Sequence, residues 1–408
     1  MKARKWFRCF GINFRPIFYV LAVMVILGFA RFLVVTRVDR RQGLKNKIAV
    51  TAGDTLRQQK PGSQRWLDKM LTGRWVPTKY TSQEMDELEN FHKRAWKHHK
   101  IPVSLQREDK KCGNVSFPNL FWFRAVCDPR GGTPCCMNSF CVDKPVQECQ
   151  CPECYDLRQP VHAEFSKWEP QDAAVQLTPF TREREVCRVL QNKTVYFIGD
   201  SFMRQVYTSA LAMLRDGKPR HVIKDTVPLV NVTNCDKYFR YLAPCGYFLI
   251  LDSLECNGTT RLSMRHLYRV TEVDRLFKAV RELNGTVNSW LVVGIGIHNL
   301  YNMTAIRQAA IDPMLKLLQN SKWPKLIWMA AQSPGLLKTG SEKRQQSQAI
   351  LDYNEKLKSI FGPLGIPIMN FFQLTKGVFS FDGAHYGKGL NDVKVNILLN
   401  FLQQETTT

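Results

Sequence analysis

The sequence predicts an α/β protein in which helices cover both faces of a parallel sheet, giving three layers. A disulfide-rich N-terminal subdomain and a single N-terminal transmembrane helix are expected before the sheet. Three observations support this fold class. Short apolar runs alternate with helix-length segments after residue 187, eight cysteines crowd into residues 112–154, and residues 17–30 carry no charge. Strands separated by helices favour a parallel sheet buried on both faces.

The composition is that of a chain that folds. The 408 residues are 44% hydrophobic and 11% aromatic, which provides enough apolar burial to exclude a fully disordered protein. Lys and Arg number 58 against 35 Asp and Glu, a net charge of +23. A basic surface can attract an anionic glycan, or it can be plain solvated charge or reflect proximity to a membrane. Nucleic acid is not an expected partner in a lumenal compartment.

Residues 17–35 are predicted to anchor the chain in a membrane as a single span. The run is interrupted only by Arg31 near its end, and about nineteen positions are enough to cross a hydrocarbon core. A cleaved signal peptide is the alternative, but no small-residue cleavage site closes the run. Residues 1–16 are then a short cytosolic tail, and the polar, basic residues 36–64 are a stem.

Most of the chain is predicted to lie in an oxidising lumen. Twelve of the thirteen cysteines follow the anchor and only Cys9 precedes it, which predicts up to six disulfides. These features describe a type II Golgi membrane glycoprotein, with the cell surface or secretion as the alternative. The candidate glycosylation sites also follow the anchor, at Asn114, Asn192, Asn231, Asn257, Asn284 and Asn302.

Residues 65–186 form the predicted disulfide-rich subdomain. A capping box at Thr81 and Glu84 predicts a helix that runs to about residue 97. The histidines near its end, His92, His98 and His99, have no carboxylate or cysteine at ligand spacing, so a solvated basic helix end is favoured over a metal site.

The cysteines at 149, 151 and 154 have the spacing of half a zinc site. A lumenal location and the lack of a second well-spaced pair favour disulfides there. The pairing of the cysteines stays open at this stage.

Residues 187–408 form the predicted sheet domain. Residues 220–268 are interpreted as a strand-rich insertion, with three cysteines inside it. Strands are expected at residues 193–198, 290–297, 326–331 and 366–369, and helices at 203–214, 304–320, 343–361 and from about 391.

Ser201 follows the first expected strand and opens the next helix. Ligands of open parallel sheets bind at the carboxyl ends of the strands, and backbone N–H groups at a helix start stabilise the oxyanion of acyl transfer. The alternative is that Asp200 or Ser201 only caps the helix.

Near the end of the chain, Asp382 precedes His385 by three residues. This spacing lets a carboxylate orient the imidazole that takes a serine proton, although ordinary loop hydrogen bonding is the alternative. Because both halves follow strands and occur in this order, the sequence predicts a catalytic triad of Ser201, His385 and Asp382.

These two blocks resemble the first and last motifs of the SGNH hydrolase superfamily. More narrowly, GDSFMRQ at residues 199–205 resembles the PC-esterase families. These are the trichome-birefringence-like glycan O-acetyltransferases, the lumenal domain of the sialic acid O-acetyltransferase and the neurexophilin/PC-esterase proteins. The resemblance covers about residues 110–408. Further similar positions are Trp168, Pro170, Phe180, Cys187, Tyr386, Gly389, Leu390 and Asn396.

The chain also departs from these families. The plant enzymes place cysteines beside their Asp-x-x-His, where this chain has Gly383 and Gly387. The superfamily's Gly-x-Asn-Asp block, whose Asn completes the oxyanion hole, is absent, and residues 294–299 occupy its expected place. Asn299 or His298 there can donate to the oxyanion, or both can cap the following helix. Asn299 is preferred because a neutral amide donates at any pH.

Three further groups have candidate roles. The backbone N–H of Ser201 is expected to donate to the oxyanion, and Gly246 is a candidate for the superfamily's second oxyanion position. Arg204, one helical turn after Ser201, either holds this turn together or binds an anionic group of the substrate.

The resemblance implies acyl transfer, O-acetyl in the best-matched relatives, to a glycan hydroxyl through an acyl-enzyme on Ser201. A carbohydrate esterase uses the same three residues, and a non-catalytic glycan-binding protein on this fold is a further alternative. No metal or bound cofactor is needed. The acyl donor stays unknown. Acetyl derived from acetyl-CoA is expected, and because one span cannot carry it across the membrane, a multispanning donor partner is expected too.

Overall fold

The computed structural model describes residues 62–215 and 222–406, which belong to one compact unit. The predicted tail (1–16) and anchor (17–35) lie outside these residues, as does nearly all of the predicted stem (36–64). Among the helices of the described ranges, none has both the length and the apolarity needed to cross a membrane.

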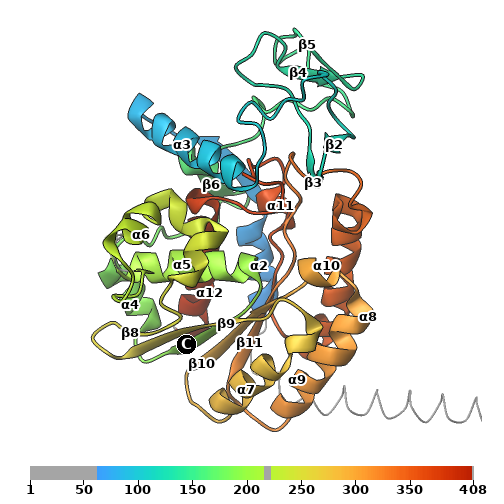
Figure 1. The fold of residues 1–408 in the computed structure, drawn as a ribbon. Helices are drawn as coiled ribbons and strands as arrows, with labels where there is room; N and C mark the ends of the chain where they lie inside the picture. Colours follow the sequence, from blue (N-terminus) through green and yellow to red (C-terminus); the bar gives the residue numbers. More distant parts are fainter. Residues whose placement is uncertain (1–61, 216–221, 407–408) are drawn as a thin grey trace, which may run out of the picture. The chain divides into compact units, whose positions relative to one another are not determined.

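A six-stranded sheet with the order β12-β11-β10-β7-β9-β8 forms the centre of the unit (Figure 1). Neighbouring strands from β12 to β9 run parallel, and β8 pairs antiparallel with β9 at the edge. The predicted parallel sheet is therefore confirmed. Its strands are β7 (Thr194–Gly199), β8 (Asp252–Glu255), β9 (Thr260–His266), β10 (Ser289–Gly294), β11 (Lys325–Met329) and β12 (Ile368–Met369).

Helices cover both faces of this sheet (Figure 1). Because successive side chains of a strand point to opposite faces, Trp290 and Val292 of β10 enter one core while Leu291 and Val293 enter the other. The first core is closed by α2 (Ser63–Leu71), α4 (Glu183–Leu190), α5 (Ser201–Leu214) and α12 (Lys388–Thr406), and the second by α7 (Asp274–Leu283), α8 (Met303–Ile306), α9 (Asp312–Leu318) and α10 (Ser347–Phe361).

Two expected elements differ in the structure. The helix expected at 304–320 is divided, because α8 passes through a π-helical turn, η7 (Arg307–Ile311), into α9. The interpretation of residues 220–268 as a strand-rich insertion is wrong, because β9 pairs with β7 from residue 261 to residue 266 as part of the central sheet.

The segment before β8 is helical. It contains α6 (Leu229–Asn234), η3 (Lys237–Tyr241) and η4 (Ala243–Tyr247). Pro228 precedes α6 and Pro244 lies in the first turn of η4, where the fixed φ of proline suits the start of a helix and excludes a central strand.

The N-terminal subdomain contains small two-stranded sheets and one long helix, α3 (Ser82–His98). The predicted capping box is confirmed: the Glu84 N–H donates to the Thr81 hydroxyl over 3.2 Å, and the Thr81 N–H donates to the Glu84 carboxylate over 2.8 Å. The paired strands are β1 (Gly73–Pro77) with β6 (Ser166–Pro170), β2 (Ser116–Phe117) with β3 (Leu120–Arg124), and β4 (Cys135–Met137) with β5 (Phe140–Val142).

All twelve cysteines within the described ranges form disulfides, which confirms the predicted six. The zinc alternative for positions 149–154 is excluded, because each of those sulfurs is bonded to another cysteine. The pairs are Cys112–Cys136, Cys127–Cys141, Cys135–Cys149, Cys151–Cys154, Cys187–Cys256 and Cys235–Cys245.

Candidate active site

The turn between β7 and α5 presents Ser201 at the carboxyl edge of the sheet. At Gly199 a Cβ atom would lie 2.1 Å from the Gly294 carbonyl oxygen of β10, so only glycine fits there. The Asp200 carboxylate accepts the Phe202 N–H over 3.0 Å and caps α5. Since Asp200 does the capping, the Ser201 hydroxyl at the first helical position is left for another partner.

The segment between β12 and α12 supplies that partner. Asp382 accepts the backbone N–H groups of Ala384 over 2.9 Å and of His385 over 2.6 Å, which closes a tight turn. The Ser380 hydroxyl donates to the His385 carbonyl over 2.7 Å. Both the N–H and the carbonyl of His385 are therefore hydrogen-bonded, which fixes the backbone that carries the imidazole.

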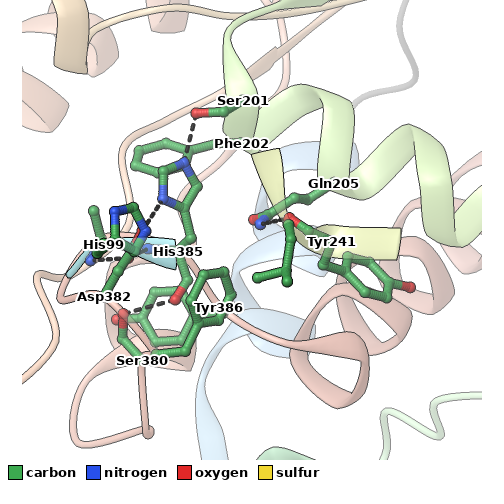
Figure 2. Close-up of polar contacts among 12 residues, drawn as sticks. His99, Ser201, Phe202, Gln205, Tyr241, Ser380, Asp382, His385 and Tyr386 are labelled. Carbon is green, nitrogen blue, oxygen red and sulfur yellow. Dashed lines mark hydrogen bonds and ion pairs between the residues drawn. The ribbon is translucent and has the colours of Figure 1, made fainter. Parts of the chain in front are cut away.

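Ser201, His385 and Asp382 form one continuous hydrogen-bonded line (Figure 2). The Ser201 Oγ lies 2.6 Å from His385 Nε2, and His385 Nδ1 lies 2.6 Å from Asp382 Oδ2. With Nδ1–H donating to the carboxylate, Nε2 is free to accept the serine proton. The structure thus brings together the three residues of the predicted triad.

The carboxylate at the end of this line is ionised at neutral pH. Burial alone would raise the pKa of Asp382, but the charge of His385 and the hydrogen bonds from its ring and backbone outweigh burial and lower this pKa to about 2. A buried anion beside the imidazole stabilises the imidazolium that forms when the serine gives up its proton.

Glycines 383 and 387 leave no room for larger residues beside this turn. Gly383 has φ +83°, and a Cβ atom there would lie 2.4 Å from the Lys338 backbone nitrogen. At Gly387 a Cβ atom would lie 2.2 Å from the Glu164 carboxylate. A cysteine at position 383 is therefore excluded by backbone conformation and packing, and one at position 387 would require the Glu164 side chain to move.

A buried network that the sequence analysis missed supports the turn from behind. Lys394 of α12 donates to the Gln332 side-chain oxygen, and the Gln332 amide donates to the Ala384 carbonyl over 2.7 Å. The Lys394 ammonium lies 5.3 Å from the centre of the Phe371 ring. In the sequence this lysine resembles the many other lysines of a basic chain, so no local signal marked the network.

Lys394 and Asp200 also line one small cavity of about 30 Å³ beneath Ser201. Burial lowers the pKa of Lys394 to about 7 and raises the pKa of Asp200 to about 6. The charge of Asp200 opposes the effect of burial on Lys394, and the charges of His385 and Arg204 oppose it on Asp200. The residue before Ser201 and the lysine behind the His385 turn therefore line one mostly apolar cavity.

Asn299, the preferred candidate for the oxyanion donor, makes hydrogen bonds to other parts of the chain. The Asn299 amide donates to the Tyr268 carbonyl over 3.0 Å and its oxygen accepts the Val270 N–H over 2.9 Å, so this side chain ties two loops together. The preference for Asn299 is therefore not supported by its contacts. Nor do Asn299 or His298 cap the next helix, because Asn302 caps α8 through the Ala305 N–H.

His298 lies within electrostatic range of His385. Its ring packs edge-on against Tyr268, 5.2 Å between centres. Burial lowers the pKa of His298 first, and the charge of His385 lowers it further, so the two histidines are within electrostatic range. A neutral imidazole there can donate to an oxyanion. The Ser201 N–H, first in its helix, has no intrahelical acceptor.

Arg204 and Gly246 contact each other beside α5. A Cβ atom at Gly246 would lie 2.7 Å from Arg204 Nη1, which itself donates to the Leu242 carbonyl over 3.4 Å. The next side chain, Gln205, donates to the Tyr241 carbonyl over 3.2 Å (Figure 2). These contacts hold η3 and η4 against the helix of Ser201, and they match the structural alternative for Arg204.

The histidines at the end of α3 do not form a solvated basic end. His92 is buried, and burial, followed by the charge of His162, lowers its pKa well below the usual value. His99 Nε2 lies 3.9 Å from Asp382 Oδ2, behind the candidate triad. Only His98 is exposed. In the described residues, the groups of three metal-ligating side chains within reach of one another consist of disulfide-bonded cysteines.

Comparison with known proteins does not assign this chain to a family. No family model matches the sequence, and no curated protein matches it. Among solved structures, the chain is similar to a mutant of an acetyl-xylooligosaccharide esterase from Geobacillus Stearmophilus. That likeness has 11% sequence identity and a TM-score of 0.30, and it covers 52% of this chain and 95% of the other. The functional conclusion therefore depends on the side chains of the site.

Proposed function

We propose that this chain is a PC-esterase-type acyltransferase of the SGNH kind, which moves an O-acetyl group to a glycan hydroxyl through an acyl-enzyme on Ser201. One observation carries the proposal. A serine at a helix start, a histidine and a buried ionised carboxylate lie in line, with both linking distances 2.6 Å. This is the arrangement that activates a serine hydroxyl for attack on an ester carbonyl.

The first half-reaction acylates the serine. Ser201 Oγ attacks the acetyl carbonyl of the donor while His385 Nε2 takes the hydroxyl proton, and Asp382 stabilises the resulting imidazolium. The Ser201 N–H and the His298 ring stabilise the negative oxygen of the tetrahedral intermediate. When that intermediate collapses, His385 returns the proton to the leaving oxygen of the donor, and acetyl stays on Ser201.

The second half-reaction decides between transfer and hydrolysis. A sugar hydroxyl gives its proton to His385 and attacks the acetyl carbonyl; the bond between the acetyl carbon and Ser201 Oγ then breaks, His385 returns the proton to Ser201, and the acetylated glycan leaves. Water in the same position gives free acetate. A carbohydrate esterase is therefore the alternative outcome on the same residues. The assembled line of hydrogen bonds speaks against a non-catalytic binding protein.

The proposed setting is the Golgi lumen, on a type II single-pass anchor at residues 17–35. The six disulfides support an oxidising compartment. In that setting the acetyl donor, derived from acetyl-CoA, comes from a multispanning partner, and no metal or bound cofactor takes part.

The test uses the full chain purified from a secretory host. The protein is incubated with an acetylated donor and oligosaccharide acceptors, and acceptor mass and free acetate are measured. Ser201→Ala is the test variant, and Ser347→Ala, at the exposed start of α10, is the control. Acetyl gain that depends on Ser201 establishes a transferase, and acetate alone establishes an esterase. If neither product depends on Ser201 in folded protein, the proposal is wrong.

A further inference from the structure

A second small cavity lies beside the candidate triad. Phe202, directly after Ser201, and Ala384, directly before His385, both line it. Its volume, counted over the positions open to the centre of a water-sized group, is about 10 Å³. This is enough for one such group. Whatever enters this cavity therefore lies next to both the proposed nucleophile and the proposed base.

Lys338 lines this cavity and lacks a partner. The residue is 9% exposed, and within the described part of the chain its ammonium makes no hydrogen bond and no ion pair. Burial lowers the pKa of Lys338, while the charges of Asp382 and Glu342 act in the opposite direction from beyond ion-pair distance. An ammonium that lines a cavity without a counter-ion from the protein can form a charge-assisted hydrogen bond with an anionic ligand group.

Gln345 lines the same cavity and is the second unpaired group. Its side-chain oxygen is buried and receives no hydrogen bond from the residues that the structure describes. Leaving such an acceptor unsatisfied costs free energy, which a ligand with a hydroxyl donor would recover. An unpaired cation and an unpaired acceptor in one cavity complement a ligand that carries an anionic group and a hydroxyl.

The disulfide-rich subdomain holds this cavity in place. Lys338 pairs with Phe123 of β3 in an antiparallel bridge, and the Arg124 N–H donates to the Leu337 carbonyl over 2.7 Å. The next residues of the loop reach the exposed end of β3. There the Thr339 N–H donates to the Trp122 carbonyl over 3.3 Å.

An exposed aromatic pair lies on β3, in the two positions before Phe123, which pairs with Lys338. Phe121 and Trp122 are 57% and 38% exposed, and their ring centres lie 4.9 Å apart. Binding sites for polar ligands combine such apolar surface with a few placed polar groups. A sugar ring has apolar C–H faces as well as hydroxyls, so it matches a surface of this kind.

We propose that this cavity, together with the aromatic pair of β3, forms the acceptor subsite and selects an acidic sugar. One oxygen of the sugar carboxylate enters the cavity and binds the Lys338 ammonium, and a neighbouring hydroxyl that stays outside this space donates to Gln345 Oε1. A cavity with room for one water-sized group fits a single carboxylate oxygen better than a bulkier sulfate ester. The inference rests on the proposed function, because it names the substrate class of that site.

Binding is measured by calorimetry on the full chain carrying Ser201→Ala, so that no turnover interferes. The ligands are a trisaccharide ending in a uronic acid, its neutral hexose counterpart and its sulfated counterpart. Lys338→Met removes the charge at similar length, and Gln345→Glu places a competing carboxylate beside Lys338. Lys343→Met, an exposed lysine in the same loop, is the matched control.

The uronate is expected to bind at least about tenfold more tightly than the neutral sugar, the size of one charge-assisted hydrogen bond. Lys338→Met and Gln345→Glu should each remove this preference, with thermal unfolding confirming a folded protein, and Lys343→Met should keep it. Unchanged preference in Lys338→Met, or binding of the sulfated sugar alone, would overturn the inference.

These experiments distinguish failure of the proposed acyl transfer from failure of the proposed acidic-sugar subsite. A Lys338-dependent preference for uronate without any Ser201-dependent acetyl chemistry would leave the binding site standing and remove the proposed function. Serine-dependent acetyl transfer with an acceptor preference that ignores Lys338 would remove the binding site alone.

Discussion

Replacing Asp382 by Asn tests the electrostatic part of the candidate triad. The carboxylate accepts the ring Nδ1–H of His385 over 2.6 Å and two backbone N–H groups of the same turn. An asparagine keeps the shape and can still accept from the backbone. Its NH₂ group, however, would donate to Nδ1, which forces the ring into the tautomer with the proton on Nε2. That tautomer cannot take the proton of Ser201.

Two magnitudes follow from this geometry. The wrong tautomer is expected to slow acylation of Ser201 by about 10⁴-fold, the cost of this change in serine-protease triads. The fall in the pKa of Asp382 from 3.8 to about 2 corresponds to about 2 kcal/mol of folding stability. Because the folded-state pKa is the lower one, this stability is present above about pH 4 and is lost as the pH falls through about 2.

The assay is the rate at which a fluorophosphonate probe labels Ser201 at pH 7, together with urea unfolding at pH 7 and pH 3. Asp392→Asn is the matched control, because that carboxylate pairs only with Lys388 on the surface of α12 among the described side chains. The Asp382→Asn variant should lose about 2 kcal/mol at pH 7 and less at pH 3. Labelling within tenfold of the parent rate would refute the triad reasoning.

Three further outcomes follow from the structure. Gly383→Ala forces a Cβ atom to 2.4 Å from the Lys338 nitrogen at φ +83°, so the free energy of unfolding should fall by about 2 kcal/mol; an unchanged melting temperature would contradict this. Removing the Cys187–Cys256 disulfide, with a sequence separation of 69, should cost about 4 kcal/mol in denaturant unfolding, well above the loss for Cys151–Cys154; equal losses would argue against loop entropy. Lys394→Met should raise stability at pH 6, because a buried ammonium whose pKa falls from 10.5 to about 7 opposes folding most at low pH. That gain should shrink towards pH 10 while labelling of Ser201 slows, and a gain that grows with pH would be inconsistent with a buried charged lysine.

The parallel sheet and the three residues in line could be predicted because local sequence encodes them. Apolar runs at residues 193–198 and 326–331 become β7 and β11 almost without change. The carboxyl ends of parallel strands meet at one edge of a sheet, so a serine after β7 and a histidine after β12 converge there. Strand order is not local, and for that reason β9 was misread as part of an insertion although it pairs with β7.

The oxyanion donors and the buried lysines could not be predicted for a related reason. The role of Asn299 depends on Tyr268 and Val270, about thirty residues away in the sequence, which occupy its amide. Lys338 and Lys394 look like any other lysine in a basic chain, and only tertiary packing shows that both are buried.

The glycines at positions 383 and 387 show how the local and tertiary levels combine. They remove the sites for a local disulfide of the kind expected from the plant enzymes that the sequence resembles, and packing against the Lys338 backbone makes glycine obligatory at position 383. Another tether must then hold the His385 turn, and the bond from Gln332 to Ala384, backed by Lys394 of α12, supplies it. Unlike a disulfide, this tether depends on a lysine whose pKa is about 7. A neutral lysine amine can still donate to Gln332, so loss of the charge changes this contact from a charge-assisted hydrogen bond to a weaker neutral one and does not abolish it.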